Sequence, residues 1–149
     1  MELEKEIIQR KFHSEFQKAV VNILYTFGWL NGRLSRLLKS HRITLQQFNV
    51  LRILRGQHPD PASVNLLIER MLDKSSNASR LVERLRQKGL VQRLVSKNDR
   101  RQVDVFITKK GLNLLTKIDK PLNEFEKKTI QLSEKEAKVL NQTLDKLRG

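Results

Sequence analysis

Apolar residues recur every three or four positions from Leu3 to Lys39, which is the spacing of one face of an α-helix. The stripe consists of Ile8, Phe12, Phe16, Val20, Ile23, Phe27, Leu30, Leu34 and Leu37. We therefore expect one long helix, about 54 Å long at the usual rise per residue. A compact globule of this chain length is only about 38 Å across, so another surface must cover part of the stripe. The alternative is a monomer in which the helix breaks at Gly28 or Gly32 and folds back.

A second amphipathic segment closes the sequence, from Leu132 to Leu147. Its apolar positions share one helical face, and Ser133 and Glu136 have the spacing of a capping box at its start. We interpret the segments at about 3–39 and 112–147 together as helices that dimerise the chain.

Between these ends, the pattern predicts three short helices and then a β-hairpin. The helices are expected from Thr44, as N-cap, to Gly56, at Ala62–Leu72 and at Ser76–Lys88. The strands are expected at Leu90–Ser96 and Val103–Thr108, joined by a six-residue tip. Helical spacing then resumes from Lys109 to Ile130, with Thr108 as a cap and a kink at Pro121. Inward-facing positions of the short helices are Phe48, Leu51, Leu54, Ala78, Leu81, Val82 and Leu85.

This order of elements is that of a winged helix-turn-helix, in which the helix before the hairpin enters the major groove of DNA. The expected fold is mainly α with a small β-hairpin wing, with dimerisation helices at both ends. We expect a single domain over 1–149, with the DNA-binding lobe at about 44–111. No internal repeat or flexible linker interrupts it.

The charge of the chain favours a polyanionic partner. Its 149 residues include 30 Lys or Arg against 16 Asp or Glu, for a net charge of +14. Half of that net charge falls within 73–111, where eleven basic residues face four acidic ones. The basic region therefore coincides with the third short helix and the hairpin, where the phosphates of a duplex would be met.

Several function classes are excluded by missing residues and motifs. The chain has no Cys, which removes disulfides, thiol catalysis and cysteine metal sites. His13, His41 and His58 form no paired motif, so we expect neither a metal nor a cofactor. No phosphate-binding glycine loop, HExxH or GxSxG occurs, so an enzyme is not expected.

The sequence also predicts a cytoplasmic protein without a membrane span. Its start, MELEKEIIQRKF, does not read as a secretion signal. Its longest uncharged stretch, Ala19 to Gly32, has 14 residues, whereas a membrane span needs about 20 apolar ones.

The candidate DNA-binding residues begin in the first turn of the third short helix. Short polar side chains there, Ser75, Ser76, Asn77 and Ser79, can approach base edges or phosphates closely. Arg80 and Arg84 lie one turn apart and can reach phosphates or guanine. The alternative is that Ser76 caps the helix, while its arginines form an ion-paired surface with Glu83.

The expected hairpin tip supplies further candidates, Lys97, Asp99, Arg100 and Arg101. An acidic residue among basic ones makes sense if the Asp99 carboxylate holds a guanidinium in a fixed pose for a narrow groove. The alternative is a simple Asn98-Asp99 turn with incidental charges.

These motifs resemble the multiple antibiotic resistance regulator (MarR) family of bacterial transcription factors. The resemblance covers essentially the whole chain and is most specific at Ser79-Arg80, Lys88-Gly89-Leu90-Val91, Asp99-Arg100-Arg101 and Thr108-Lys109-Lys110-Gly111. It implies a homodimeric winged-helix regulator that binds pseudo-palindromic operators in double-stranded DNA. We expect repression, because a dimer bound at a promoter excludes polymerase, although the same contacts could serve an activator. It also implies that Arg101 enters the minor groove and Asp99 orients an arginine, while Ser76, Asn77, Ser79 and Arg80 lie at the major groove.

Members of that family are often released from DNA by a small aromatic effector. Phe16, Val20, Leu24, Phe48 and Phe106 are candidates for a pocket, although their spacing favours a core. The competing function is a basic architectural DNA- or RNA-binding protein without sequence preference. The third short helix and the hairpin tip have no aromatic residue to stack on unpaired bases, which favours duplex DNA.

Overall fold

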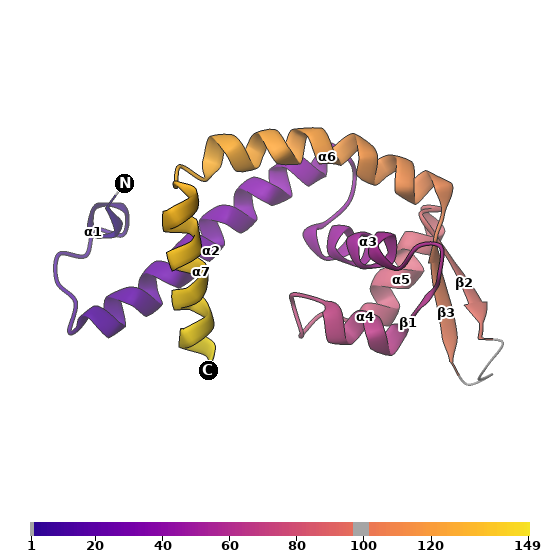
Figure 1. The fold of residues 1–149 in the computed structure, drawn as a ribbon, viewed down its shortest axis with the longest axis horizontal. Helices are drawn as coiled ribbons and strands as arrows, with labels where there is room; N and C mark the ends of the chain where they lie inside the picture. The colour runs from indigo at the N-terminus through magenta and orange to yellow at the C-terminus, as the bar shows by residue number, and fades with distance from the viewer. Residues whose placement is uncertain (1, 97–101) are drawn as a thin grey trace. The chain divides into compact units, whose positions relative to one another are not determined.

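The computed structural model describes residues 2–96 and 102–149, and the chain divides into two compact units, Met1–Leu115 and Thr116–Gly149. Figure 1 shows a mostly helical chain with one small sheet, which confirms the expected fold class. The helices are α1 (Leu3–Glu6), α2 (Glu15–Lys39), α3 (Leu45–Gln57), α4 (Val64–Arg70), α5 (Ala78–Gln87), α6 (Lys109–Thr129) and α7 (Glu134–Arg148). The strands are β1 (Ala62–Ser63), β2 (Val91–Val95) and β3 (Val103–Ile107).

The prediction of one helix from Leu3 to Lys39 is wrong, because the chain breaks between α1 and α2. Ile8 has a φ of 55°, a backbone conformation that no α-helix contains. The Ser14 hydroxyl then accepts a hydrogen bond from the Gln17 N–H at 3.1 Å and caps α2. The helix continues through Gly28 and Gly32, so the alternative break at these glycines is also wrong.

The short helix α1 folds back on one side of α2. Lys18 Nζ lies 2.5 Å from a Glu4 carboxylate oxygen, and the Tyr25 hydroxyl donates to Glu6 at 2.9 Å. The hydrogen bond from Lys18 holds the pKa of Glu4 below its ordinary value. Positions 18 and 25 share one side of the helix, so α1 leaves the apolar stripe on the other side uncovered.

The uncovered stripe of α2 is strongly exposed in the single chain. Phe16 is 85% exposed, and Val20, Ile23, Leu24 and Phe27 are exposed with it. The core interpretation of Phe16, Val20 and Leu24 is therefore wrong, because no part of the described chain covers them.

The segment from α3 to β3 forms a lobe with its own core. Thr44 and Gln47 cap α3 reciprocally, each accepting the other's backbone N–H at 3.2 Å, as the expected N-cap requires. Figure 1 shows α3, α4 and α5 beside the sheet. The largest fully buried side chains of this lobe are Leu51, Leu54, Leu67, Met71, Leu85, Val50, Val82, Val91 and Val105.

The sheet has the strand order β1-β3-β2 and is antiparallel. The hairpin of β2 and β3 is confirmed, with Val91 opposite Ile107 and Val95 opposite Val103. The third strand, β1, was not expected, and Ala62 pairs with Val105 instead of starting a helix. The helix α4 begins two residues later, where the Ser63 hydroxyl accepts from the Leu66 N–H at 3.1 Å.

The last helix, α7, begins at the capping box that the sequence predicts. The Ser133 hydroxyl accepts from the Glu136 N–H, and the Glu136 side chain accepts from Ser133, which lowers the pKa of the Glu136 carboxyl. The helix has no buried residue, and Val139, Leu140 and Leu147 are exposed. Within the described ranges, no helix is long and apolar enough to span a membrane, and no cluster of side chains is suited to a metal ion.

Candidate nucleic-acid interface

The helix α5 separates an apolar face from a polar one. Ala78, Val82 and Leu85 are buried in the lobe, at most 3% exposed. Arg80 and Arg84 lie on the exposed side, as does Ser79 in the first turn. The short and cationic side chains that the sequence marks for DNA contact are therefore turned toward solvent.

The N-cap of α5 is Asn77, not Ser76. The Asn77 Oδ1 atom accepts a hydrogen bond from the Arg80 N–H at 2.9 Å. The prediction of a helix from Ser76 and the alternative role of Ser76 as cap are both wrong, because helical backbone begins at Ala78. The Asn77 amide nitrogen, which can only donate, takes no part in the cap.

Asp73 orders the turn that leads into α5, a role that the sequence analysis missed. Its Oδ1 atom accepts from the Ser75 N–H at 3.0 Å and from the Ser75 hydroxyl at 2.6 Å. The Ser75 hydroxyl, followed by its N–H and by the side chains of Ser76 and Gln46, lowers the pKa of Asp73. An Asp two residues before a Ser is the usual signal of such a turn, and it was present in the sequence.

The same turn is tied to α3 and α4. The Leu72 N–H donates to Asn49 Oδ1 of α3 at 2.9 Å. Lys74 Nζ donates to the carbonyl oxygens of Ile68 and Glu69 at the end of α4. Lys74 thereby satisfies carbonyls that a helix terminus leaves without partners. The start of α5 is thus fixed by contacts on both neighbouring helices.

The cations of α5 differ in their partners. Arg86 donates to Glu83 through two nitrogens, at 2.8 and 3.0 Å, and this contact lowers the pKa of the Glu83 carboxyl. Neither Arg80 nor Arg84 forms an ion pair with any residue that the structure describes. The ion-paired-surface alternative therefore holds for Glu83 and Arg86 alone, which leaves Arg80 and Arg84 available to a phosphate or a base.

The hairpin adds a second basic element beside α5. Its exposed side carries Arg93, and the Ser96 N–H donates to the Gln102 carbonyl at 3.0 Å where the described strands end. The expected tip residues, Lys97, Asp99, Arg100 and Arg101, lie outside the described residues.

The lobe matches a known family. The MarR family model matches residues 43–103, the span from the start of α3 to the start of β3. Residues 43–103 of the chain are thus similar to the MarR family. The residues on which the resemblance in sequence rested lie largely within this MarR-family segment.

Two curated relatives are transcriptional regulators of the helix-turn-helix type. The HTH-type transcriptional regulator TtmR of Methylorubrum extorquens is 36% identical over 97 residues, which cover 64% of this chain and 49% of TtmR. The regulator SarZ of Staphylococcus haemolyticus is 29% identical over 77 residues, or 52% of this chain and 51% of SarZ. The chain thus spans about half the length of the curated relatives it matches.

Solved structures share the fold over most of the chain. The MarR transcription factor of Planctomyces limnophilus has a TM-score of 0.70 and 26% identity, and the match covers 93% of this chain and 98% of that one. S. aureus MepR in complex with DNA has a TM-score of 0.74 at 22% identity, over 86% and 92% of the two chains. The organohalide-sensing regulator RdhR with bound 2,4-dichlorophenol has a TM-score of 0.80 at 19% identity, over 94% and 85%. TtmR, SarZ, the P. limnophilus protein and RdhR are all named as regulators of transcription.

A cavity of about 330 Å³ borders the turn before α5. Its apolar wall comes from α2, α3 and the end of α4, and consists of Phe27, Leu45, Met71 and Leu72. Asn49 and Asp73, which hold the turn, also line it. Phe16, Val20, Leu24, Phe48 and Phe106, which the sequence offered as candidates for a pocket, do not line this cavity.

Proposed function

We propose that the protein is a sequence-specific regulator of transcription that binds double-stranded DNA through α5 and the hairpin. The observation that carries this proposal is the exposed side of α5, where the side chains of Arg80 and Arg84 have no ion-pair partner among the described residues. The turn that precedes this helix is held in place by hydrogen bonds to α3 and α4. The proposed contacts are Ser75, Ser76, Asn77, Ser79, Arg80 and Arg84, with Lys97, Asp99, Arg100 and Arg101 added from the sequence alone. The complex of MepR with DNA supports the placement of this fold on a duplex.

The protein acts as a homodimer in this proposal. The stripe of α2 and the apolar side of α7 expose large side chains that water disfavours. A second copy covers both surfaces without any further component, and two-fold symmetry then matches a pseudo-palindromic operator. Bound at a promoter, such a dimer excludes polymerase, so repression is the expected outcome. This activity places the protein with the chromosome, in the cytoplasm of a bacterial cell.

A small aromatic effector fits the 330 Å³ cavity beside Asp73. Pockets of this size and apolar lining are typical of small-molecule sites. The likeness to RdhR, which was solved with 2,4-dichlorophenol, supports an effector of this class. A ligand that displaces Leu72 or Asp73 would disturb the turn before α5 and so weaken the hold on DNA.

The test compares two arginines of the same helix. Arg80→Gln removes an exposed cation without a described partner, and we expect it to weaken operator binding by about 1–3 kcal/mol. Arg86→Gln removes an equal charge that is already paired with Glu83, and we expect a much smaller loss. Fluorescence titrations over a range of salt concentrations measure both. Equal losses in the two variants would show that only net charge matters and that binding is not specific.

A further inference from the structure

A second cleft, of about 740 Å³, lies within the first unit. It is formed by the end of α2, the start of α3 and the end of α5. Four cationic side chains line it, namely Lys39, Arg42, Arg84 and Lys88. The described lining contains no Asp or Glu, so the charge of the cleft is not balanced from within.

The walls of this cleft are held by specific hydrogen bonds. Lys88 Nζ donates to the Arg42 carbonyl at 2.6 Å and to Gln47 Oε1 at 3.1 Å, which joins α5 to the start of α3. Gln47 is only 3% exposed and is fixed by its capping box with Thr44. The position of Lys88 is therefore set by buried structure, unlike that of an ordinary surface lysine.

The opposite wall is a polar stripe on α2. Asn31, Ser35 and Lys39 follow one another at intervals of four residues, so they share one face of the helix. The cleft thus offers hydrogen-bond donors from α2 opposite the cations of α5 and Arg42. The start of α3 adds the positive end of a thirteen-residue helix, which strengthens the same field.

We propose that this cleft binds a small molecule carrying a phosphate or a comparable multivalent oxyanion. Four like charges that converge on one hollow repel one another, and a bound dianion relieves that repulsion while accepting hydrogen bonds from several of them. The volume lies within the range of small-ligand sites. A cleft of this volume encloses a ligand of small-molecule size, so we assign it to a free anion and not to the extended backbone of a duplex. The proposal does not require DNA binding, but Arg84 is shared with the proposed DNA contacts, so the test changes other residues of the cleft.

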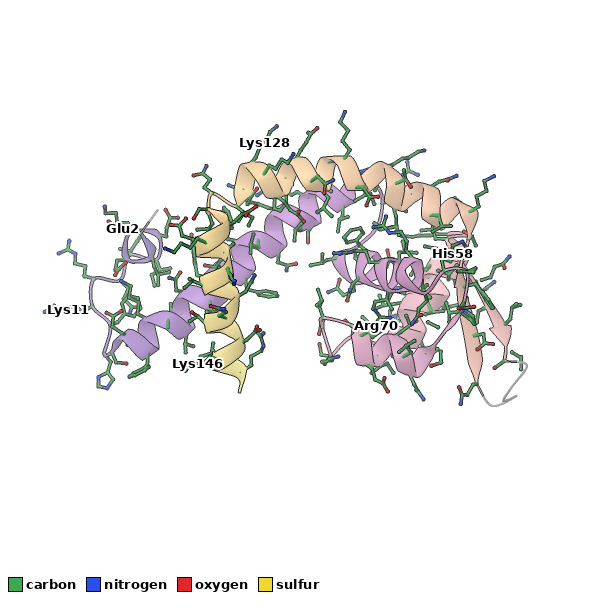
Figure 2. The ribbon with its side chains drawn as sticks, viewed as in Figure 1. Glu2, Lys11, His58, Arg70, Lys128 and Lys146 are labelled. Carbon is green, nitrogen blue, oxygen red and sulfur yellow. The ribbon has the colours of Figure 1, made fainter. Side chains whose placement is uncertain are left out.

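The test is isothermal titration calorimetry of the full chain with inorganic pyrophosphate at constant ionic strength, which measures the affinity and the stoichiometry. We compare the wild type with the double variant Lys39→Gln/Arg42→Gln, neither of whose residues is among the proposed DNA contacts. The matched control is Lys11→Gln/Arg70→Gln, which removes the same charge from exposed positions outside the cleft. Figure 2 labels both control residues, on the segment before α2 and on α4.

We expect saturable binding of one pyrophosphate per chain, about tenfold weaker in the cleft variant and unchanged in the control. Absence of saturable binding, or equal weakening in both variants, would overturn the proposal, because only general charge attraction would remain. A cleft variant that loses affinity for a duplex while it binds pyrophosphate normally would also overturn it and assign the cleft to DNA.

Discussion

The Asp73 carboxylate accepts a hydrogen bond from the Ser75 hydroxyl at 2.6 Å, and the same oxygen accepts the Ser75 backbone N–H at 3.0 Å. The side chain and the backbone of the exposed Ser75 are therefore held by one carboxylate, which gives α5 a fixed starting point. Asp73 lies between α4 and α5, and its carboxylate orders the turn that precedes the polar first turn of α5. The proposed function places that first turn against DNA.

We predict that Asp73→Ala weakens DNA binding although it removes a negative charge from a DNA-binding lobe. The loss of the turn leaves Ser75, Ser76 and Asn77 disordered before they bind, and we expect affinity to fall about three- to tenfold. Asp60→Ala is the control, since it removes an equal charge from an exposed turn elsewhere. Equilibrium titration with one duplex measures both variants. An affinity for Asp73→Ala equal to that of Asp60→Ala would contradict this role.

The pKa of Asp73 determines the pH range in which the turn before α5 loses its stabilising hydrogen bonds. Hydrogen bonds from the Ser75 hydroxyl and backbone N–H hold that pKa below its ordinary value of 3.8. Because the folded pKa is the lower one, the stabilisation is complete above the ordinary value and is lost as the pH falls through the folded value. An NMR titration of the Asp73 carboxyl should therefore give a midpoint below 3.8. A midpoint at or above 3.8 would show that the hydrogen bonds do not form in solution.

Gly111 is predicted to be the glycine least tolerant of alanine. A Cβ atom there would lie 2.4 Å from the Leu90 carbonyl oxygen and 2.8 Å from Ile107 Cγ1, which forces α6 away from the sheet. We expect Gly111→Ala to lower the free energy of unfolding by about 3 kcal/mol. Gly56→Ala, in α3 with nothing within 4 Å, should raise it by about 0.5–1 kcal/mol. Urea denaturation measures both, and similar values for the two would contradict the close packing at Gly111.

The exposed stripe of α2 is predicted to be the dimer interface. Leu24→Glu places a charge where the partner's apolar surface would bury it, so we expect the dissociation constant of the dimer to rise about a hundredfold. Leu94→Glu makes the identical change at a similarly exposed leucine of β2, 55% against 65% for Leu24, and should leave the dimer intact. Sedimentation equilibrium distinguishes the two. A dimer unaffected by Leu24→Glu would place the interface elsewhere.

The parts of the fold that local sequence determines were predictable. Thr44 and Ser133 were expected as caps and cap their helices, and the hairpin strands lie within one residue of their predicted limits. Each of these depends on residues close together in the chain. The buried positions Ala78, Val82 and Leu85 of α5 followed from helical periodicity in the same way, whereas Leu81 is only partly buried.

The errors arise where distant residues or unusual backbone decide the structure. The apolar spacing around Ile8 continues into α2, but the positive φ of Ile8 and the cap at Ser14 end the regular pattern. The strand β1 has only two residues, and its partner Val105 is far along the chain, so no local pattern shows it. The exposure of Phe16 was misjudged because a buried core and an apolar face that the chain leaves exposed produce the same spacing.

Selection of bound fragments from genomic DNA, followed by footprinting of the wild-type protein at physiological salt, tests the central claim most directly. Two copies of α5 related by two-fold symmetry predict protection of inverted half-sites whose centres lie about 10 bp apart. A single asymmetric half-site, or equal affinity for every duplex offered, would contradict the account.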